Sequence, residues 1–510
     1  MSGSVSYNPM NGRLTAGRKP FSYEVAKPQE DSSNHWSSTE NNRNNARNVN
    51  FNNGNANNNN KNNGNVVRPV AAFQDYDVPA AFVESVWEAY FDCLHGKMRS
   101  KQAVEYMEIA NDDIPKLAYE LWHGTYKSGT STCFLVHYPK LREVFAANFR
   151  DRIVHHWICL RLNPLFEERF EKQGNVSFNC RKEYGTEKAV QYVADGMKRV
   201  SNCYHKPAWV FKGDLVGFFM SIDKELLWYL LERFIRRQRK RYEREGWKSL
   251  DYAILYRLKT YQMREMYWDI LTRTAKMVVM HHPERDCILN TDPREWTNLA
   301  KNKSLFTSPT GEPIGNLTTQ IFANFLMSYF VSYVQWLYRD KNYCFAQFVD
   351  DFVIVCDDLR FLVDSIPKID AFLNTKLRLS LHKNKRYLQP VSHGVKFVGA
   401  FIKPGRLYMS NRTAGRMVER CHGFAMKMRE TELEDWDKEN IMQTLNSYMG
   451  FTRRRRTYKI RNRAMDIIGK DFWRYFYLQG SFIDDGANKK RLWNIVKMRR
   501  HIKPRNNEYL

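Results

Sequence analysis

The sequence predicts an α+β fold in which antiparallel strands carry acidic side chains at their ends. Apolar runs lie on both sides of Asp350 and Asp351 and predict a hairpin with these two carboxylates at its tip. Residues 209–212 predict another short strand, which ends at Asp214. The apolar stretch 321–338 predicts a long helix buried against the strands. Strands and long helices in separate segments are typical of the α+β class.

The paired carboxylates at the hairpin tip predict a metal site, because they repel each other and a divalent cation supplies the missing positive charge. A second acidic pair, Asp357 and Asp358, is expected to be an ordinary surface turn, and a lone strand-end aspartate is most often a helix cap. Two acidic strand ends in a basic chain are nevertheless what two-metal phosphoryl transfer requires, with ions about 3.5 to 4 Å apart. The sequence therefore predicts two Mg²⁺ ions, with Mn²⁺ as the alternative.

A third segment, residues 311–320, forms a glycine-containing turn with an amide-rich exit. In chain order, the strand end at Asp214, this loop and the pair Asp350 and Asp351 resemble the palm of a reverse transcriptase. The resemblance extends from about residue 75 to 463. It implies a right-hand polymerase fold with fingers, a palm built on an antiparallel sheet and a helical thumb.

The resemblance also implies roles for the acidic residues and their surroundings. Asp214, Asp350 and Asp351 would be the catalytic residues and the metal ligands, and the backbone carbonyl of Leu215 would complete a metal site. The substrates would be dNTPs, a template RNA and a primer. The family further implies a small basic oligomeric accessory protein as a partner.

The incoming nucleotide is expected to meet several segments. Arg181 matches a motif whose guanidinium contacts the triphosphate, since guanidinium holds phosphate bidentately; a solvated surface charge is the simpler alternative. Phe219, five residues after the first aspartate, matches the side chain that excludes a ribose 2′-hydroxyl, and Phe218 competes for this role. Lys385 matches the lysine that protonates the departing pyrophosphate, with Lys383 as a rival. The nucleotide-binding set is Arg152, Arg181, Phe218, Phe219, Ile314, Gly315, Gln320 and Lys385.

Within the reverse transcriptases, the nucleotide loop resembles that of diversity-generating retroelement enzymes. Most relatives carry Gln-Gly followed by Ser-Pro, whereas these enzymes carry Ile-Gly followed by Ser-Gln. Here Ile314 precedes Gly315, and Thr319 precedes Gln320. Threonine at this position departs from the pattern, as does Phe348, where tyrosine is usual. An aliphatic residue before the glycine removes a polar contact near the nascent base pair, so we expect error-prone copying.

Residues 41–65 are dominated by asparagine, so residues 1–73 are predicted to form a disordered tail. This run is bracketed by residues 36–40 and 67–70, a frame that resembles the terminal strands of C-type-lectin-like variable proteins, which are the targets of diversity-generating retroelements. Asparagine codons begin with two adenines, and the template repeats of that family are copied with errors at adenines. We therefore expect this reading frame to run through its own template repeat.

The charge of the chain favours a nucleic-acid partner. It contains 80 Lys and Arg against 55 Asp and Glu, which gives a formal charge of +25 and a pI near 9.6. Charge runs are most often solvated faces, but tyrosines and tryptophans interleave with those of the C-terminal region, which predicts a thumb lying on a primer and template duplex. The residues expected at nucleic acid are Arg236, Arg237, Arg453, Arg454, Arg455, Arg456, Lys459 and Arg461.

The predicted division is a tail at 1–73, a fingers and palm body at 74–406, and a basic helical thumb with a C-terminal tail at 407–510. Residues 76–125 show the apolar spacing of helices. Nine cysteines without paired spacing indicate reduced thiols in the cytoplasm. No basic and apolar leader opens the chain, and polar residues interrupt the stretch 321–338, so we expect neither secretion nor membrane association.

Three functions fit these observations. The leading one is an RNA-directed DNA polymerase that copies a template-repeat RNA into adenine-mutagenised cDNA for diversification of a target gene. A defence-associated or retron-type bacterial reverse transcriptase would apply the same chemistry to a different RNA. The third is an RNA-binding scaffold without catalysis, and the intact acidic residues at 214, 350 and 351 weigh against it.

Overall fold

The computed structural model describes most of the chain from residue 77 to 499. The exceptions within that span are residues 99, 138–140, 246–257, 259, 291–303, 309, 454 and 484–489. Only the backbone is described for 480–483, 490–494 and three strands near the start of the chain. Helices and antiparallel sheets occur together, which confirms the predicted α+β class.

The asparagine-rich tail contains a three-stranded antiparallel sheet. Its strands are β1 (Asn34–Glu40), β2 (Asn45–Asn50) and β3 (Ala56–Asn60), in the order β1-β2-β3. Residues 36–40 of the predicted bracket lie in β1, whereas 67–70 lie outside the described residues. The remaining residues of 1–73 are also outside the described part of the chain, so the disordered tail stays a prediction for them.

The chain forms two compact units, and each is described by itself. Unit 1 comprises residues 1–132, 147–160 and 235–278, and unit 2 comprises 133–146, 161–234 and 279–510. These units do not follow the predicted boundaries at 74 and 407, which stay a prediction.

Unit 1 is mainly helical around a core of large aromatic rings. Phe82 packs edge-on against Trp122 and Trp157, with ring centroids 5.1 and 5.6 Å apart, and Trp157 Nε1 donates a hydrogen bond of 2.9 Å to Ser85 Oγ. The helices predicted for residues 76–125 are confirmed as α1 and α2. The helices are α1 (Ala80–Leu94), α2 (Lys101–His123), and parts of α3 (Phe149–Lys172), α6 (Lys224–Arg244) and α8 (Tyr261–Met280).

Unit 2 contains a four-stranded antiparallel sheet of order β10-β6-β9-β8. Its strands are β6 (Trp209–Gly213), β8 (Tyr343–Phe348), β9 (Asp351–Cys356) and β10 (Tyr387–Pro390). The predicted hairpin and the predicted strand at 209–212 are thus confirmed.

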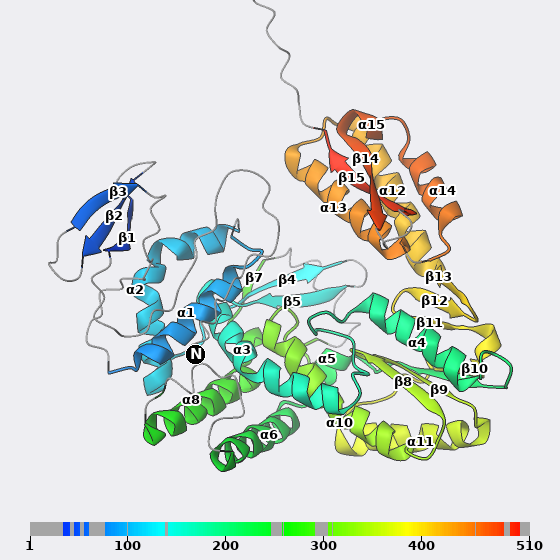
Figure 1. The fold of residues 1–510 in the computed structure, drawn as a ribbon, viewed down its shortest axis with the longest axis horizontal. Helices are drawn as coiled ribbons and strands as arrows, with labels where there is room; N and C mark the ends of the chain where they lie inside the picture. The colour runs from blue at the N-terminus through cyan, green and yellow to red at the C-terminus, as the bar shows by residue number, and fades with distance from the viewer. Residues whose placement is uncertain are drawn as a thin grey trace, which may run out of the picture. The chain divides into compact units, whose positions relative to one another are not determined.

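Helices cover both faces of this sheet. Successive side chains of a strand point to opposite sides, so neighbouring residues of β9 contact different helices. Val353 belongs to the apolar cluster shared with α4 (Thr186–Val200). The ring of its neighbour Phe352 packs against Phe330 of α10 (Leu317–Leu337), with centroids 4.9 Å apart. Figure 1 shows α4 on one side of the strands and α10 with α11 (Leu359–Lys376) on the other. The predicted helix at 321–338 is confirmed as α10.

A second sheet of unit 2, with the order β5-β4-β7, packs beside a short helix. It contains β4 (Thr132–Val136), β5 (Arg142–Ala146) and β7 (Ile288–Leu289). A small apolar cluster joins it to α5 (Phe218–Ser221) and to the loop that precedes α10; its buried members are Cys133, Phe145, Met220 and Leu305. The first acidic strand end and the loop are therefore held by one core.

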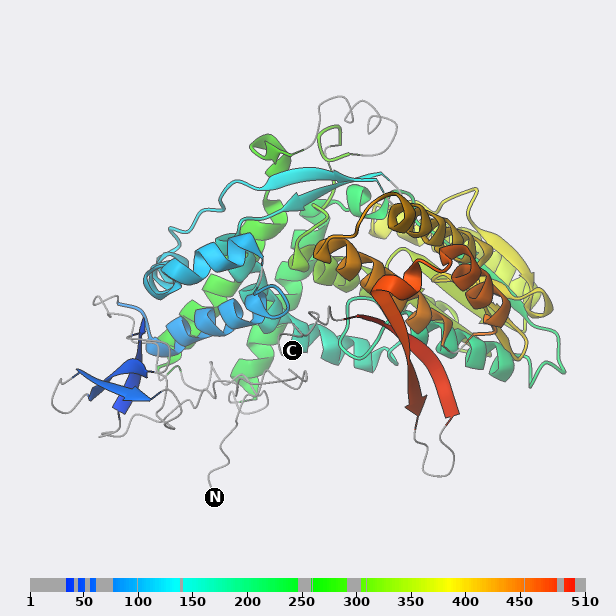
Figure 2. The same ribbon diagram turned by 90° about the horizontal axis from the view of Figure 1, so that it is seen from above.

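The C-terminal region is helical, as predicted, and also contains a two-stranded sheet that the sequence analysis did not predict. Its helices are α12 (Asn411–Glu430), α13 (Asp435–Thr452), α14 (Tyr458–Ile468) and α15 (Phe472–Tyr475), and its strands are β14 (Phe476–Ile483) and β15 (Lys490–Met498). Figure 2 shows this strand pair in red beside the helices. A three-stranded sheet of β11 (Val395–Phe397), β12 (Ala400–Lys403) and β13 (Arg406–Met409) precedes them. Among the described helices, none is long and apolar enough to cross a membrane.

Candidate active site

The three predicted carboxylates come from two adjacent strand ends. Strands β6 and β9 pair antiparallel with Gly213 opposite Phe352, so Asp214, the next residue after β6, lies beside the turn between β8 and β9. Phe348 pairs with Asp351, which leaves a two-residue turn that contains Asp350. The register of the sheet therefore brings together residues that are more than a hundred positions apart in the chain.

Burial and mutual repulsion raise the pKa values of the hairpin carboxyls. For Asp350, burial is the largest cause, and the charge of Asp214 adds to it. For Asp351, burial raises the pKa to about 6, against an opposing effect of Lys212, while the two other aspartates raise it further. A raised pKa means that the ionised carboxylate is less favourable in this site than in water, and the positive charge of a bound cation would offset part of that cost.

Two lysines partly supply that charge. Lys385 Nζ lies 2.7 Å from Asp214 Oδ2, and Lys212 Nζ lies 3.0 Å from Asp351 Oδ1. The first pair distinguishes the two predicted candidates, because both lysines are exposed but Lys383 forms no ion pair within the described residues. Lys212 was missed by the sequence analysis; its position on β6, two residues before Asp214 and on the same face of the strand, was the available signal.

Leu215, the predicted backbone ligand, is buried and forms an antiparallel bridge with Leu381. The hydrogen bonds of this bridge run from the His382 amide to the Asp214 carbonyl, 2.7 Å, and from the Val216 amide to the Ser380 carbonyl, 2.9 Å. The bridge thus uses the groups of the flanking residues and leaves the Leu215 carbonyl outside it.

The carboxylates fit a hard divalent cation by their chemistry, because Mg²⁺ prefers oxygen ligands. Asp351 Oδ1 is buried, and its partner within the described part of the chain is the Lys212 ammonium group at 3.0 Å. Yet the described residues contain no group of three or more His, Cys, Asp or Glu already arranged to hold a metal ion. The donor set is therefore suitable, and the lysine pairs occupy part of it.

The two candidates for the sugar-selecting side chain differ in exposure. Phe218 is 3% exposed and belongs to the core, whereas Phe219 is only partly buried. Their rings pack on each other with centroids 5.2 Å apart. A side chain that screens a bound nucleotide must reach the surface, so the structure favours Phe219.

The predicted nucleotide loop is held against β5. The Phe145 amide donates a 2.7 Å hydrogen bond to the Ile314 carbonyl, and a Cβ atom at Gly315, where φ is 132°, would overlap the Phe145 carbonyl. Glycine is therefore required at this position. Ile314 packs partly buried against the apolar cluster, Thr319 Oγ1 donates to the Pro313 carbonyl at 2.8 Å, and Gln320 is exposed.

The two predicted nucleotide-binding arginines have local partners instead. The Arg181 side chain is 1% exposed, pairs with Glu167 at 2.7 Å, and lies 4.0 Å above the Tyr184 ring. The structure thus gives this guanidinium a packing role, and no face of it is open to a triphosphate. Arg152 Nε donates to the Ala147 carbonyl at 2.8 Å and belongs to unit 1, whereas the acidic residues belong to unit 2.

Arg142 is a basic residue near the carboxylates that sequence reasoning missed. It is exposed at the start of β5, and its positive charge lowers the pKa of Asp350. The sequence analysis predicted no strand at this position.

The predicted nucleic-acid residues divide into exposed and buried side chains. Arg236 and Arg237 are exposed on α6 in unit 1, and Arg456 and Lys459 are exposed in unit 2. Arg455 differs, because its side chain is 0% exposed and pairs with Glu187 at 2.8 Å. It holds the C-terminal helices to α4 and is not available to a phosphate. Arg453 and Arg461 are partly buried, and Arg454 lies outside the described residues.

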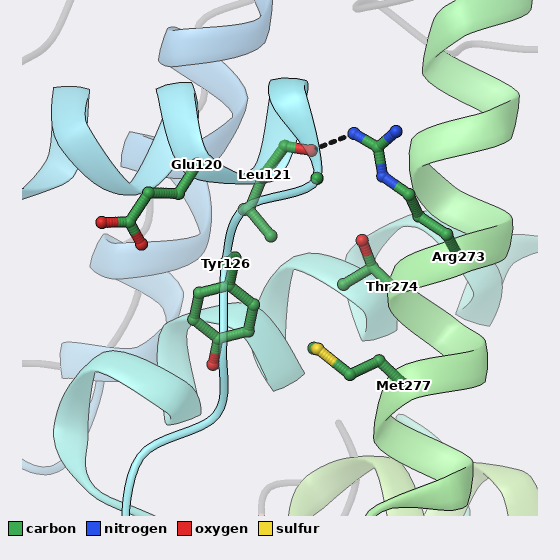
Figure 3. Close-up of a pocket in the computed structure, with 7 residues that line it drawn as sticks. Glu120, Leu121, Tyr126, Arg273, Thr274 and Met277 are labelled. Carbon is green, nitrogen blue, oxygen red and sulfur yellow. Dashed lines mark hydrogen bonds between the residues drawn. The ribbon is translucent and has the colours of Figure 1, made fainter.

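A small cavity lies elsewhere, within unit 1. It has a volume of about 160 Å³ and lies between the end of α2 and α8, where Arg273 donates a hydrogen bond to the Leu121 carbonyl (Figure 3). Arg273 also donates to the carbonyl of Trp122. The guanidinium thereby satisfies carbonyls at a helix C-terminus, a structural task. None of the predicted catalytic residues lines this cavity.

No protein-family model matches the chain, and no curated protein matches it. Similar solved structures are telomerases. The telomerase from Candida albicans in complex with the TWJ fragment of telomeric RNA is 13% identical, with 68% of this chain and 56% of that chain covered and a TM-score of 0.38. The apo telomerase from Candida tropicalis is 12% identical, with 68% and 56% covered and a TM-score of 0.41. The matched region spans little more than half of those telomerases, and similarity at this level assigns neither a family nor an activity.

Proposed function

We propose that the protein is an RNA-directed DNA polymerase that extends a primer along a template RNA by two-metal phosphoryl transfer. The observation that carries the proposal is the convergence of Asp214, Asp350 and Asp351 at two adjacent strand ends, together with the raised pKa values of the Asp350 and Asp351 carboxyls. Three acidic residues gathered at one place in a chain with a formal charge of +25 support a bound cation, because perturbed carboxyl pKa values are typical of functional sites.

The residues present can be given roles in that reaction. Asp214, Asp350 and Asp351, with the Leu215 carbonyl, would hold two Mg²⁺ ions, which when bound lower the pKa of the primer 3′-hydroxyl and neutralise the triphosphate. Lys385, next to Asp214, supports a role as proton donor to the departing pyrophosphate.

Nucleotide selection would use the surface formed by Phe219 and the loop at Ile314. The bulk of the phenyl ring would exclude a ribose 2′-hydroxyl and so select deoxynucleotides. Ile314 offers the nascent base pair no hydrogen-bonding side chain, and a site without such a group rejects a wrong substrate weakly. This supports error-prone copying.

The finer proposal is a diversity-generating retroelement enzyme that acts in the cytoplasm with a basic oligomeric accessory protein. It would copy a template-repeat RNA into adenine-mutagenised cDNA for diversification of a target gene. Its support is the Ile-Gly and Thr-Gln pattern at 314 to 320 and the asparagine-rich run at 41–65.

Primer extension on the cognate transcript tests both levels of the proposal. Replacing Asp350 and Asp351 together by alanine should reduce extension to background while RNA binding and thermal unfolding change little. The matched control is the same double change at Asp357 and Asp358, at the other end of β9, which should retain extension. Extension by the first double variant would refute the mechanism.

Sequencing of the products separates the subfamilies. Errors confined to template adenines support the diversity-generating assignment, whereas an even and low error rate indicates a defence-associated or retron-type enzyme. RNA binding by the native protein without any extension, in Mg²⁺ or in Mn²⁺, indicates a scaffold without catalysis.

A further inference from the structure

The turn that carries the hairpin carboxylates contains a strained residue. Val349 has a φ of 57°, in the left-handed region that a β-branched side chain strongly disfavours. Strain of this kind persists only where surrounding contacts impose it. Because Val349 immediately precedes Asp350 and Asp351, its backbone conformation sets the direction of both side chains.

One side chain supplies such a contact. Gln347 Nε2 donates a 2.6 Å hydrogen bond to the Val349 carbonyl. The opposite orientation of the amide would place Oε1 against that carbonyl, so the bond fixes how the amide is oriented. Gln347 is 1% exposed, and its Oε1 accepts no hydrogen bond within the described residues. A buried amide with an unpaired oxygen is unfavourable by itself, so packing alone does not account for glutamine at this position.

The backbone of Gln347 is held in place independently of its side chain. Its amide donates to the Val176 carbonyl at 2.9 Å, and its carbonyl accepts from the Phe178 amide at 3.0 Å, in a parallel bridge with Ser177. Ser177 Oγ in turn donates to Asn324 Oδ1 of α10 at 2.9 Å, and both residues are buried. Because the backbone of Gln347 is bonded to residues 176 and 178, and Ser177 is bonded to α10, the Gln347 side chain can hold the Val349 carbonyl in place.

We propose that Gln347 is a positioning residue, which holds Val349 in its left-handed conformation and so fixes the direction in which Asp350 and Asp351 are presented. The inference rests on the proposed function for its catalytic consequence, but the holding of the turn can be tested without catalysis.

The test compares Gln347→Met, which keeps the length of the side chain and removes the donor, with Gln389→Met. Gln389 is the matched control, because its Nε2 also donates to a backbone carbonyl, that of Gly394, from β10 of the same sheet. Hydrogen exchange of the amides at 349 to 351 is measured in the metal-free full chain. We expect exchange about tenfold faster in Gln347→Met and a change of less than about twofold in Gln389→Met, since a hydrogen bond of this kind contributes up to about tenfold in an equilibrium.

Primer extension provides the second readout. Gln347→Met should lower kcat by about tenfold and raise the Mg²⁺ concentration for half-maximal rate, with the KM for dNTP unchanged. Adding Val349→Gly to Gln347→Met should recover most of the lost kcat, because glycine adopts positive φ without strain and no longer needs the bond. If Gln347→Met does not fold, Gln347→Asn, whose amide is one methylene too short, takes its place.

The exchange rates and the kcat values each test whether Gln347 holds the turn. Exchange and kcat in Gln347→Met that equal those of Gln389→Met would overturn the inference, as would a kcat loss that Val349→Gly does not relieve. Absence of extension by the native protein would refute the proposed function instead, and the exchange rates alone would then decide whether Gln347 holds the turn.

Discussion

Replacing Asp351 by asparagine is expected to stabilise the metal-free protein while it abolishes catalysis. The ionised carboxylate lies in a buried site with two other aspartates nearby, and these raise its pKa to about 6. Asparagine has nearly the same shape and carries no charge, so it resembles the protonated acid at every pH.

The size of the effect follows from the pKa shift. The pKa of Asp351 rises from 3.8 to about 6, and a tenfold change in proton affinity corresponds to about 1.36 kcal/mol. Asp351→Asn should therefore raise the free energy of unfolding by about 3 kcal/mol above neutral pH. The effect of Lys212 is already contained in this shift, because that ion pair is present when the pKa is raised.

The sign of the pH dependence provides a further check. Since the folded-state pKa is above the unfolded one, the folded protein binds this proton more tightly. The stabilisation from the protonated carboxyl is fully present below about pH 4 and is lost as the pH rises through about 6. The native protein and Asp351→Asn should therefore be equally stable near pH 4 and differ most above pH 7.

Urea unfolding in EDTA, at intervals from pH 4 to pH 8, measures this difference. The control is Asp357→Asn, an exposed aspartate at the other end of β9, which should change stability by less than about 0.5 kcal/mol. Adding Mg²⁺ should stabilise the native protein and not Asp351→Asn. An Asp351→Asn variant that is less stable than the native protein at pH 8 in EDTA would refute the electrostatic reasoning.

Three further predictions concern neighbouring side chains. Phe219→Ala should raise ribonucleotide incorporation relative to deoxynucleotide by about tenfold or more, whereas Phe218→Ala should instead lower the free energy of unfolding by about 3 to 5 kcal/mol in urea titrations. Lys385→Met should lower single-turnover rates by about a hundredfold, and equal losses in Lys383→Met would contradict the assignment. Arg181→Met should destabilise by about 1.5 to 3 kcal/mol through loss of its ion pair; a raised KM for dNTP at unchanged stability would restore the predicted nucleotide contact.

The parts of the fold that sequence could predict are those with strong periodicity. The hairpin around residues 350 and 351 and the helix α10 have long apolar runs, and both occur where the pattern placed them. The strand pair β14 and β15 was missed although Asp485 and Gly486, a dipeptide typical of hairpin turns, lie between its two halves. The surrounding basic residues were interpreted as a helical surface, and charge says nothing about secondary structure.

The same contrast holds for the site, where residues within a motif were predicted and contacts between distant segments were not. The three aspartates were found because a family pattern fixes their order. The environment of each basic residue was not found, since Arg181 and Arg455 are buried and pair with Glu167 and Glu187, contacts that the folded structure creates and no local pattern indicates. Lys212 was overlooked for the opposite reason: a lysine on a strand is ordinarily a solvated side chain, and only the pairing of β6 with β9 makes it a counter-ion.

The two lysines at the carboxylates differ in a way that bears on the reaction. The Lys212 side chain is 16% exposed and rooted in the central strand β6, whereas that of Lys385 is 59% exposed on the segment before β10. Solvent reaches the Lys385 side of its ion pair with Asp214 and weakens it, so separating these two groups requires less free energy than separating Lys212 from Asp351. A lysine that neutralises Asp214 cannot at the same time donate a proton to a leaving group. We therefore expect cation binding at Asp214 to release Lys385 for that role, while Lys212 stays with Asp351, so that metal binding itself readies the proton donor.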